Sequence, residues 1–189
     1  MMDLPTILLQ LSNALLYPVI GALTLLLIWV VVGIGGFARE GWARRRHRRS
    51  WRDQVRRAVI DPDLRFMVAE LTPPSGIPAR ALSHPGAHRA KTLDDLELES
   101  ERALDRMLIG LRLGPLLGLA GTLIPLGPAL MALSDGDLAA LSSRLVVAFT
   151  TTVIGLVIGA LSFVMHTVRR QWYVQDLADA EFLLERIDP

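Results

Sequence analysis

The sequence predicts an all-α integral membrane protein with three transmembrane helices, the second and third of which extend into a cytoplasmic helical bundle. Three stretches that lack Asp, Glu, Lys and Arg carry this prediction: residues 4–38, 113–134 and 145–168. A helix needs about 20 apolar residues to cross the hydrocarbon core of a bilayer, and each stretch is long enough. Hydrophobic residues make up 51% of the 189-residue chain. Because cysteine is absent, disulfides and thiol chemistry are excluded.

The arginines predict how these helices are oriented. Nine arginines lie within residues 39–57, and Arg169 and Arg170 follow the third stretch, whereas the connection 134–144 holds one arginine and two aspartates. The positive-inside rule therefore places the N-terminus outside and the C-terminus in the cytoplasm of a multi-pass protein of the cell inner (cytoplasmic) membrane. The predicted organisation is an external N-terminus with the first membrane helix (1–38), a cytoplasmic helical region (39–110), two membrane helices (111–168) with a short external loop (134–144), and a cytoplasmic C-terminal helix (169–189).

The arginine run next to the first membrane helix is predicted to lie on the membrane surface. Its members are Arg44, Arg45, Arg46, Arg48 and Arg49. Anionic lipid headgroups attract such residues by about 1 kcal/mol each. A basic run can also bind nucleic acid, but the position directly after an apolar stretch favours the membrane, and no nucleic-acid partner is expected.

Amphipathic patterns predict the helical extensions. Thr92 and Asp95 resemble a capping box, and the pattern that follows continues without proline until Pro115, so one long helix is expected to run into the second span. A similar pattern covers 169–187. Asp61-Pro62 predicts the start of a short helix, and the prolines and glycines of 72–88 predict a loop.

Small and polar residues recur on one face of the second and third spans. In the second span their spacing is 4, 3, 4 and 3: Gly114, Gly118, Gly121, Pro125 and Pro128. In the third span it is 3, 4, 3 and 4: Thr152, Gly155, Gly159, Ser162 and His166. Residues at these spacings share a helix face. Small residues let membrane helices approach closely, so the glycines and prolines are predicted to set helix packing and pore shape.

Four hydroxyl side chains are candidates to line an ion path: Thr122, Thr151, Thr152 and Ser162. Polar groups at membrane depth are expected to face the bundle interior or a hydrated path. The alternative is that each hydroxyl bonds to a carbonyl of its own helix or joins neighbouring helices. No span contains an Asp or Glu, and His166 lies near the inner end of its span, so a titrating group at mid-membrane is expected to belong to a partner. Four scattered histidines without cysteine predict neither a metal site nor an enzyme, and no cofactor is expected.

Two segments resemble the MotA/TolQ/ExbB proton channel family. Residues 114–122 (GPLLGLAGT) resemble the start of the second span in ExbB and TolQ proteins, and residues 151–156 (TTVIGL) resemble their third span. The resemblance implies a homopentamer around an ExbD/TolR/MotB-like single-span partner that carries an ion-binding Asp. Thr122 and Thr152 match the two hydroxyls that face this aspartate in the family.

The sequence departs from the ExbB and TolQ pattern at two places. Val147 stands where those proteins carry a glutamate, and residues 125–128 (PLGP) differ from the usual continuation. The resemblance therefore implies a divergent, ExbB/TolQ-like branch, with cargo and coupling ion left open. The function expected is that of the channel-forming subunit of an inner-membrane, proton- or sodium-driven motor complex that transmits work to the single-span partner. The alternative is a non-conducting membrane scaffold or transporter accessory subunit.

Overall fold

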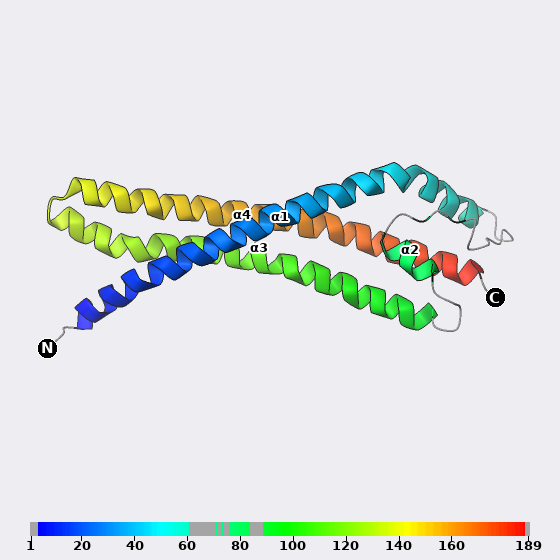
Figure 1. Cartoon of the computed structure of the whole chain (residues 1–189), viewed down its shortest axis with the longest axis horizontal. Helices are drawn as coiled ribbons and strands as arrows, with labels where there is room; N and C mark the ends of the chain where they lie inside the picture. The colour runs from blue at the N-terminus through cyan, green and yellow to red at the C-terminus, as the bar shows by residue number, and fades with distance from the viewer. Residues whose placement is uncertain (1–3, 61–70, 72, 74–75, 84–88, 188–189) are drawn as a thin grey trace. The chain divides into compact units, whose positions relative to one another are not determined.

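The computed structural model describes residues 4–60, 71, 73, 76–83 and 89–187, which form helices without any strand (Figure 1). The helices are α1 (Leu4–Ile60), α2 (Ile77–Leu82), α3 (Arg89–Ser134) and α4 (Leu138–Ile187). Three of them contain segments long and apolar enough to cross a membrane: Ala14–Arg46, Lys91–Ser134 and Leu138–Glu185. The predicted all-α membrane protein with three spans is therefore confirmed.

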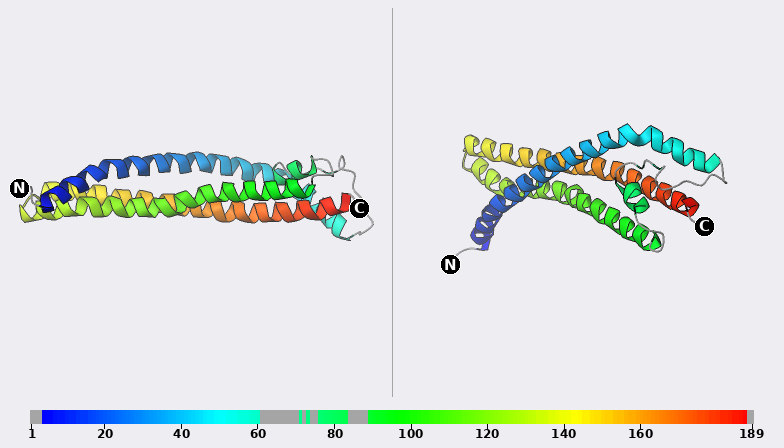
Figure 2. Two further views of the ribbon diagram at one scale, coloured as in Figure 1. Left: turned by 90° about the horizontal axis from the view of Figure 1, so that it is seen from below. Right: turned by 45° about the vertical axis from the view of Figure 1, so that its right-hand side comes forward.

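One compact unit, here called the membrane unit, comprises Met1–Gly33 and Arg106–Val164. Within it α3 and α4 run side by side as a helical hairpin, which all views in Figures 1 and 2 show. Many of its large side chains are exposed, as expected of helices that face lipid. The buried hydrophobic positions are few and come from all three long helices: Leu23, Val30, Met107, Ala129, Ala148 and Ile158.

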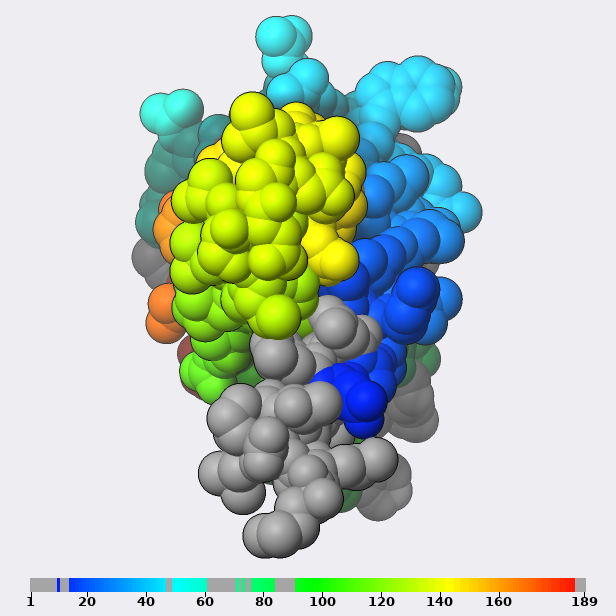
Figure 3. All heavy atoms as spheres, turned by 90° about the vertical axis from the view of Figure 1, so that its left-hand side faces the viewer, coloured from blue at the N-terminus to red at the C-terminus, as the bar shows by residue number. Residues whose placement is uncertain are grey.

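The α3–α4 connection is shorter than predicted. A loop was expected over 134–144, but only residues 135–137 separate the two helices. Gly136 has a φ of 73°, which glycine adopts without steric cost. Asp137 then caps α4, because its Oδ1 accepts a hydrogen bond from Ala140 N at 2.9 Å. This cap starts the helix early. Figure 3 views this end, with the turn in yellow-green facing the viewer.

The long third helix was predicted correctly, although its start was not. α3 is continuous from Arg89 to Ser134 and passes through Pro115, Pro125 and Pro128. Thr92 thus lies in the first turn of the helix instead of capping it. The helix begins earlier because nothing between Arg89 and Thr92 opposes helix formation: Ala90 and Lys91 are both good helix formers.

The second compact unit comprises Ile34–Asp105 and Met165–Pro189 and is here called the arginine-rich unit. Its core joins buried residues of all four helices, among them Trp51, Ala81, Leu96 and Leu183. Apart from those of α2, these side chains come from the amphipathic segments that follow or precede the apolar stretches, and their burial holds the unit together.

Helix α2 corrects the loop predicted over 72–88. Ile77–Leu82 is helical, with Pro78 in the first turn, where its missing N–H costs nothing. Ile77, Ala81 and Leu82 are buried against the core, so the burial of apolar side chains outweighs the local turn signals. The helix expected after Asp61-Pro62 lies largely outside the described residues.

Candidate functional site

Glycines bring the backbones of α3 and α4 into contact in the membrane unit. A Cβ atom added at Gly114 would lie 2.8 Å from the carbonyl oxygen of Gly155 and 3.1 Å from the amide nitrogen of Gly159. One added at Gly118 would lie 3.2 Å from the Gly155 Cα. No side chain fits at these positions without moving a helix, so the two glycine stripes of the sequence face each other.

The rest of the α3 stripe is also buried. Pro125 and Pro128 are both buried, and a Cβ at Gly121 would lie 2.6 Å from the Cβ of Thr151. On the α4 side, a Cβ at Gly159 would lie 2.9 Å from the Cγ of Pro115. The small residues of both helices therefore make room for the partner helix, as expected when packing has to replace the hydrophobic effect inside a bilayer.

Thr152 lies directly on this contact. Its Oγ1 is 3.4 Å from the carbonyl oxygen of Gly118 on α3 and 3.3 Å from that of Ala148 on its own helix. Both distances are long for an O–H···O bond, so the single hydroxyl hydrogen is weakly shared between two carbonyls. The side chain is half-buried. Thr152 thus combines an interhelical contact with partial access from outside the subunit.

Thr122 lies one turn along α3 from Gly118 and is likewise half-buried. Its hydroxyl donates to the carbonyl oxygen of Leu119 at 2.7 Å. This is the local bond that sequence reasoning offered as the alternative to a path-lining role. Such a bond uses the hydroxyl hydrogen but leaves the oxygen able to accept.

Thr151 and Ser162 lie deeper between the helices. Thr151 is 5% exposed, and its hydroxyl donates to the carbonyl oxygen of Ala148 at 2.8 Å. Ser162 is 0% exposed, and among the described residues its Oγ has no hydrogen-bond partner. The four candidate hydroxyls therefore separate into two half-buried threonines and two side chains inside the α3–α4 contact.

Ser162 packs against Gly110, a residue that sequence reasoning missed. A Cβ added at Gly110 would collide with the Ser162 side chain and would lie 3.4 Å from the ring of Trp29 on α1. All three long helices of the membrane unit meet here. Gly110 precedes Gly114 by four residues, so the spacing of the stripe was a signal that could have found it.

The arginine-rich unit contains a largely buried ion-pair network that sequence reasoning also missed. Arg44 on α1 contacts Asp176 on α4 (Nη1 to Oδ2, 2.6 Å) and Glu40 on its own helix (Nη2 to Oε1, 3.1 Å). Arg169 contacts the other oxygen of Glu40 at 3.0 Å. The arginine side chain of Arg44 is only 13% exposed. Two cations and two carboxylates thus connect α1 and α4.

Aromatic rings surround this network. The guanidinium of Arg44 lies 5.1 Å from the ring centre of Trp172, within range of a cation–π interaction. Phe37 stacks on the same indole, with ring centres 5.3 Å apart. Gly41 makes room for Trp172, because a Cβ there would lie 3.2 Å from its Cη2. Trp51 Nε1 donates to Asp179 Oδ2 at 3.0 Å.

Burial shifts the protonation of the two aspartates, which follow the apolar part of α4. Burial raises the pKa of the Asp176 carboxyl above its usual value, although the charge of Arg44 opposes the shift. Burial also raises the pKa of Asp179, against the opposing hydrogen bond from Trp51. In both residues desolvation of the carboxylate is the larger effect.

The five arginines predicted to lie on the membrane surface do not behave alike. Arg45, Arg46 and Arg49 are exposed. Arg44 is instead held inside the arginine-rich unit by Asp176, so the structure places it apart from the others. The side chain of Arg48 lies outside the described residues.

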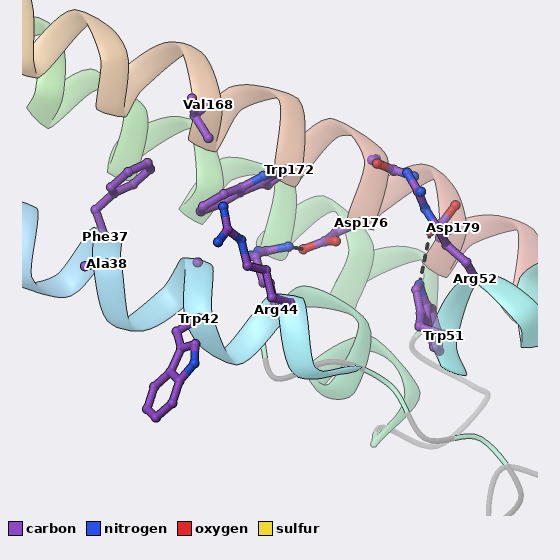
Figure 4. A pocket seen from close by; sticks show the side chains of 13 residues that line it. Phe37, Ala38, Trp42, Arg44, Trp51, Arg52, Val168, Trp172, Asp176 and Asp179 are labelled. Carbon is purple, nitrogen blue, oxygen red and sulfur yellow. Dashed lines mark hydrogen bonds and ion pairs between the residues drawn. The ribbon is translucent and has the colours of Figure 1, made fainter. Parts of the chain in front are cut away.

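A pocket of about 510 Å³ opens beside the network, between α1 and α4 (Figure 4). Apolar residues line part of it, whereas Arg44, Asp176 and Asp179 line another part. Figure 4 shows Arg44 projecting from α1 toward Trp172 and Asp176. The pocket therefore combines apolar surface with charged groups of both signs.

The three apolar helices and the glycine-packed contact between α3 and α4 define a multi-pass membrane protein. The chain belongs to the MotA/TolQ/ExbB proton channel family, whose model matches residues 79–181. The family resemblance seen in the second and third spans is thereby confirmed. The match also covers helical sequence before the second span and after the third. Comparisons with curated proteins and with solved structures found no match.

Proposed function

We propose that this chain is the channel-forming subunit of a motor complex that a flow of protons or sodium ions drives. The complex lies in the inner membrane, with the N-terminus of the subunit outside and its C-terminus in the cytoplasm. Several copies, five by the family resemblance, surround a single-span partner of the ExbD/TolR/MotB kind. Membership of the proton channel family supports the general role.

The observation that carries the proposal is the pair of half-buried threonines on adjacent helices. Thr152 on α4 contacts the Gly118 carbonyl on α3, and Thr122 lies one turn from Gly118. Both lie in stretches without Asp, Glu, Lys or Arg. They are the polar groups in these stretches that combine a hydroxyl with partial exposure next to the close contact between the two helices.

The hydrogen bonds of these threonines favour a particular chemistry. Because Thr122 already donates to Leu119 O and Thr152 to carbonyl oxygens, each hydroxyl oxygen has lone pairs left to accept. Such an oxygen can accept a hydrogen bond from a protonated carboxyl or coordinate Na⁺. An ionised carboxylate, which only accepts hydrogen bonds, would have to compete with carbonyl oxygens for both hydroxyl hydrogens. The pair therefore suits the neutralised, ion-loaded form of a partner's aspartate.

Ion flux through the reconstituted complex tests the proposal. The full chain is purified with its co-purifying partner, placed in liposomes, and the internal pH and Na⁺ are followed after a potassium diffusion potential is applied. Thr122→Val and Thr152→Val each remove one polar contact at nearly constant volume. We expect each to lower the flux about tenfold, as for the loss of about 1.4 kcal/mol.

A matched threonine controls for loss of packing. Thr24 on α1 also donates to a carbonyl of its own helix, Ile20 O at 2.8 Å, and is exposed. Thr24→Val should leave the flux unchanged, and Thr152→Ser should retain most of it. Full flux in the Thr122→Val/Thr152→Val double variant would overturn the proposal.

The scaffold alternative is favoured by one observation, the lack of Asp, Glu, Lys and Arg in all three apolar stretches. Native mass spectrometry separates the two functions. A pentamer that holds a single-span protein supports the channel subunit, whereas a monomer or dimer without ion flux supports a scaffold or accessory subunit.

A further inference from the structure

We propose that the pocket of the arginine-rich unit binds the phosphate headgroup of an anionic phospholipid, with the acyl chains leaving along its apolar side. Residues from both α1 and α4 line this pocket of about 510 Å³. Its apolar lining includes Phe37, Ala38 and Val168, and its basic lining includes Arg45 and Arg52. The proposal concerns lipid binding and does not depend on ion conduction.

The pocket lies at the end of the uncharged stretch in both α1 and α4. Ala38 is the last residue of the uncharged stretch in α1, and Val168 is the last in α4. Both line the pocket. Each helix therefore changes from apolar to charged sequence at the pocket, which is where a membrane helix passes from the hydrocarbon core to the headgroups. The apolar side faces the depth of acyl chains and the basic side the depth of phosphates.

The pocket also has basic side chains that can bind a phosphate group. Arg44 already forms ion pairs with Asp176 and Glu40. Arg45 is exposed and forms no ion pair with the part of the chain that the structure describes, and Arg52 forms no ion pair there either. Asp179 also lines the pocket, and the charge of Arg52 acts on its carboxylate, so Arg45 is the more available of the two arginines for an anion. Guanidinium matches the geometry of phosphate oxygens.

The exposed Trp42 supports a lipid headgroup. Its side chain lines the pocket and is 79% exposed. Indole rings are enriched at the level of lipid headgroups, because their apolar ring and polar N–H suit the two sides of the interface. A tryptophan this exposed beside Arg45 and Arg52 is explained when lipid covers it.

A soluble aromatic phosphate compound, such as a nucleotide, fits the pocket less well. Its base would need an aromatic face, but Trp172 is already stacked with Phe37 and carries the guanidinium of Arg44. Trp51 is buried and hydrogen-bonded to Asp179. In addition, the apolar side of the pocket continues the membrane-spanning sequence, where a water-soluble ligand has no access.

Retention of single lipids in detergent tests the site, because a micelle lacks the surface potential of an anionic bilayer. The full chain is incubated with phosphatidylglycerol or phosphatidylcholine, and bound lipids are counted by native mass spectrometry. We expect a clear preference for phosphatidylglycerol. The variant Arg45→Gln/Arg52→Gln should weaken its retention about tenfold or more, because two charged contacts to phosphate are lost.

A control variant removes the same charge from the same helix. Arg46 and Arg49 are exposed but do not line the pocket. Arg46→Gln/Arg49→Gln should leave retention unchanged within about twofold, because exposed charges outside a contact are screened. Equal losses in the two variants would mean attraction by overall charge and would overturn the site. No preference for phosphatidylglycerol in the unmodified chain would also overturn it.

Two further measurements test whether misfolding or a soluble ligand could explain the result instead. Ala38 is exposed, so Ala38→Leu adds bulk to the apolar side of the pocket without affecting a buried group. It should lower phosphatidylglycerol retention while the melting temperature stays unchanged, and normal retention would count against the site. Glycerol 3-phosphate has the phosphate without acyl chains. It should not displace the lipid, and displacement would identify a soluble phosphate compound instead.

Discussion

Arg44 on α1 and Asp176 on α4 form a 2.6 Å ion pair whose side chains are only 13% and 9% exposed. Both charges have lost most of their hydration, and each is compensated chiefly by the other, with Glu40 as the second partner of Arg44. Removing one member of such a pair leaves a buried charge without its counterion. The pair therefore makes the packing of α1 against α4 in the arginine-rich unit sensitive to single substitutions.

Arg44→Leu should destabilise the protein by about 3 kcal/mol, because Asp176 then remains buried without its main partner. The double variant Arg44→Leu/Asp176→Leu should lose clearly less than the sum of the single losses, since neither charge remains. Unfolding in detergent, followed by circular dichroism, measures the free energies. Additive losses would show that the two side chains act independently.

The exposed pair of Arg80 and Glu99 is the matched control. Its atoms are 2.7 Å apart, almost as close as in the buried pair, but the side chains are 57% and 58% exposed. Glu99→Gln should therefore change the free energy of unfolding by less than about 1 kcal/mol.

Asp179→Asn should reduce the dependence of stability on pH. Burial raises the pKa of Asp179 in the folded protein above its usual value of 3.8, so the folded state binds the proton more tightly than the unfolded state. The contribution of this carboxyl is therefore most favourable at low pH and is lost as the pH rises through the raised pKa.

Asparagine cannot ionise but can still accept the hydrogen bond from Trp51 Nε1. The free energy of unfolding, measured at several values between about pH 4 and pH 7, should fall less with rising pH in the variant than in the unmodified protein. Asp176 contributes in the same direction, so part of the slope will remain. An unchanged slope would contradict the assignment to Asp179.

The membrane helices could be predicted because they depend on local properties. The length of an uncharged stretch and the lack of proline before Pro115 are readable along the chain, and α3 and α4 confirm the long extended helices. The pairing of distant charges was not readable. Trp51 and Asp179 are 128 positions apart, and nine arginines in 39–57 look equivalent by composition. One signal was present, since Trp172, Asp176 and Asp179 share a helix face.

The candidate site was predictable to a similar extent. Spacing placed the small residues of α3 and α4 on single faces, and Gly114 does face Gly155. Spacing does not determine how deep a hydroxyl lies or which carbonyl it chooses, because both depend on how the helices are rotated against each other. That is why Thr122 and Ser162 looked alike in sequence, although one is half-buried and the other fully enclosed. Their path-lining roles stay predictions.

Gly155→Ala should strongly destabilise the membrane unit. The added Cβ would lie 2.8 Å from the Cα of Gly118 and would collide with the carbonyl oxygen of Gly114, so α3 and α4 would have to separate. Overpacking of this kind costs about 1–3 kcal/mol. The melting temperature in detergent should drop accordingly.

Gly21 provides the control, because an added Cβ there meets nothing within 4 Å. Gly21→Ala should keep or raise the melting temperature, as alanine favours a helix over glycine by up to about 1 kcal/mol. Equal effects of the two substitutions would mean that helix propensity, and not contact between α3 and α4, decides stability.

Ser162→Ala separates a structural hydroxyl from one that serves ions. Ser162 is fully buried, and within the described chain its Oγ has no hydrogen-bond partner, so the hydroxyl bears a desolvation cost without a compensating bond. Alanine removes that cost of about 1–3 kcal/mol at the loss of only one small atom. We therefore expect a higher melting temperature with unchanged ion flux in liposomes. A lower flux in a variant that remains stable would contradict this expectation and would support the path-lining role that the sequence predicts for Ser162.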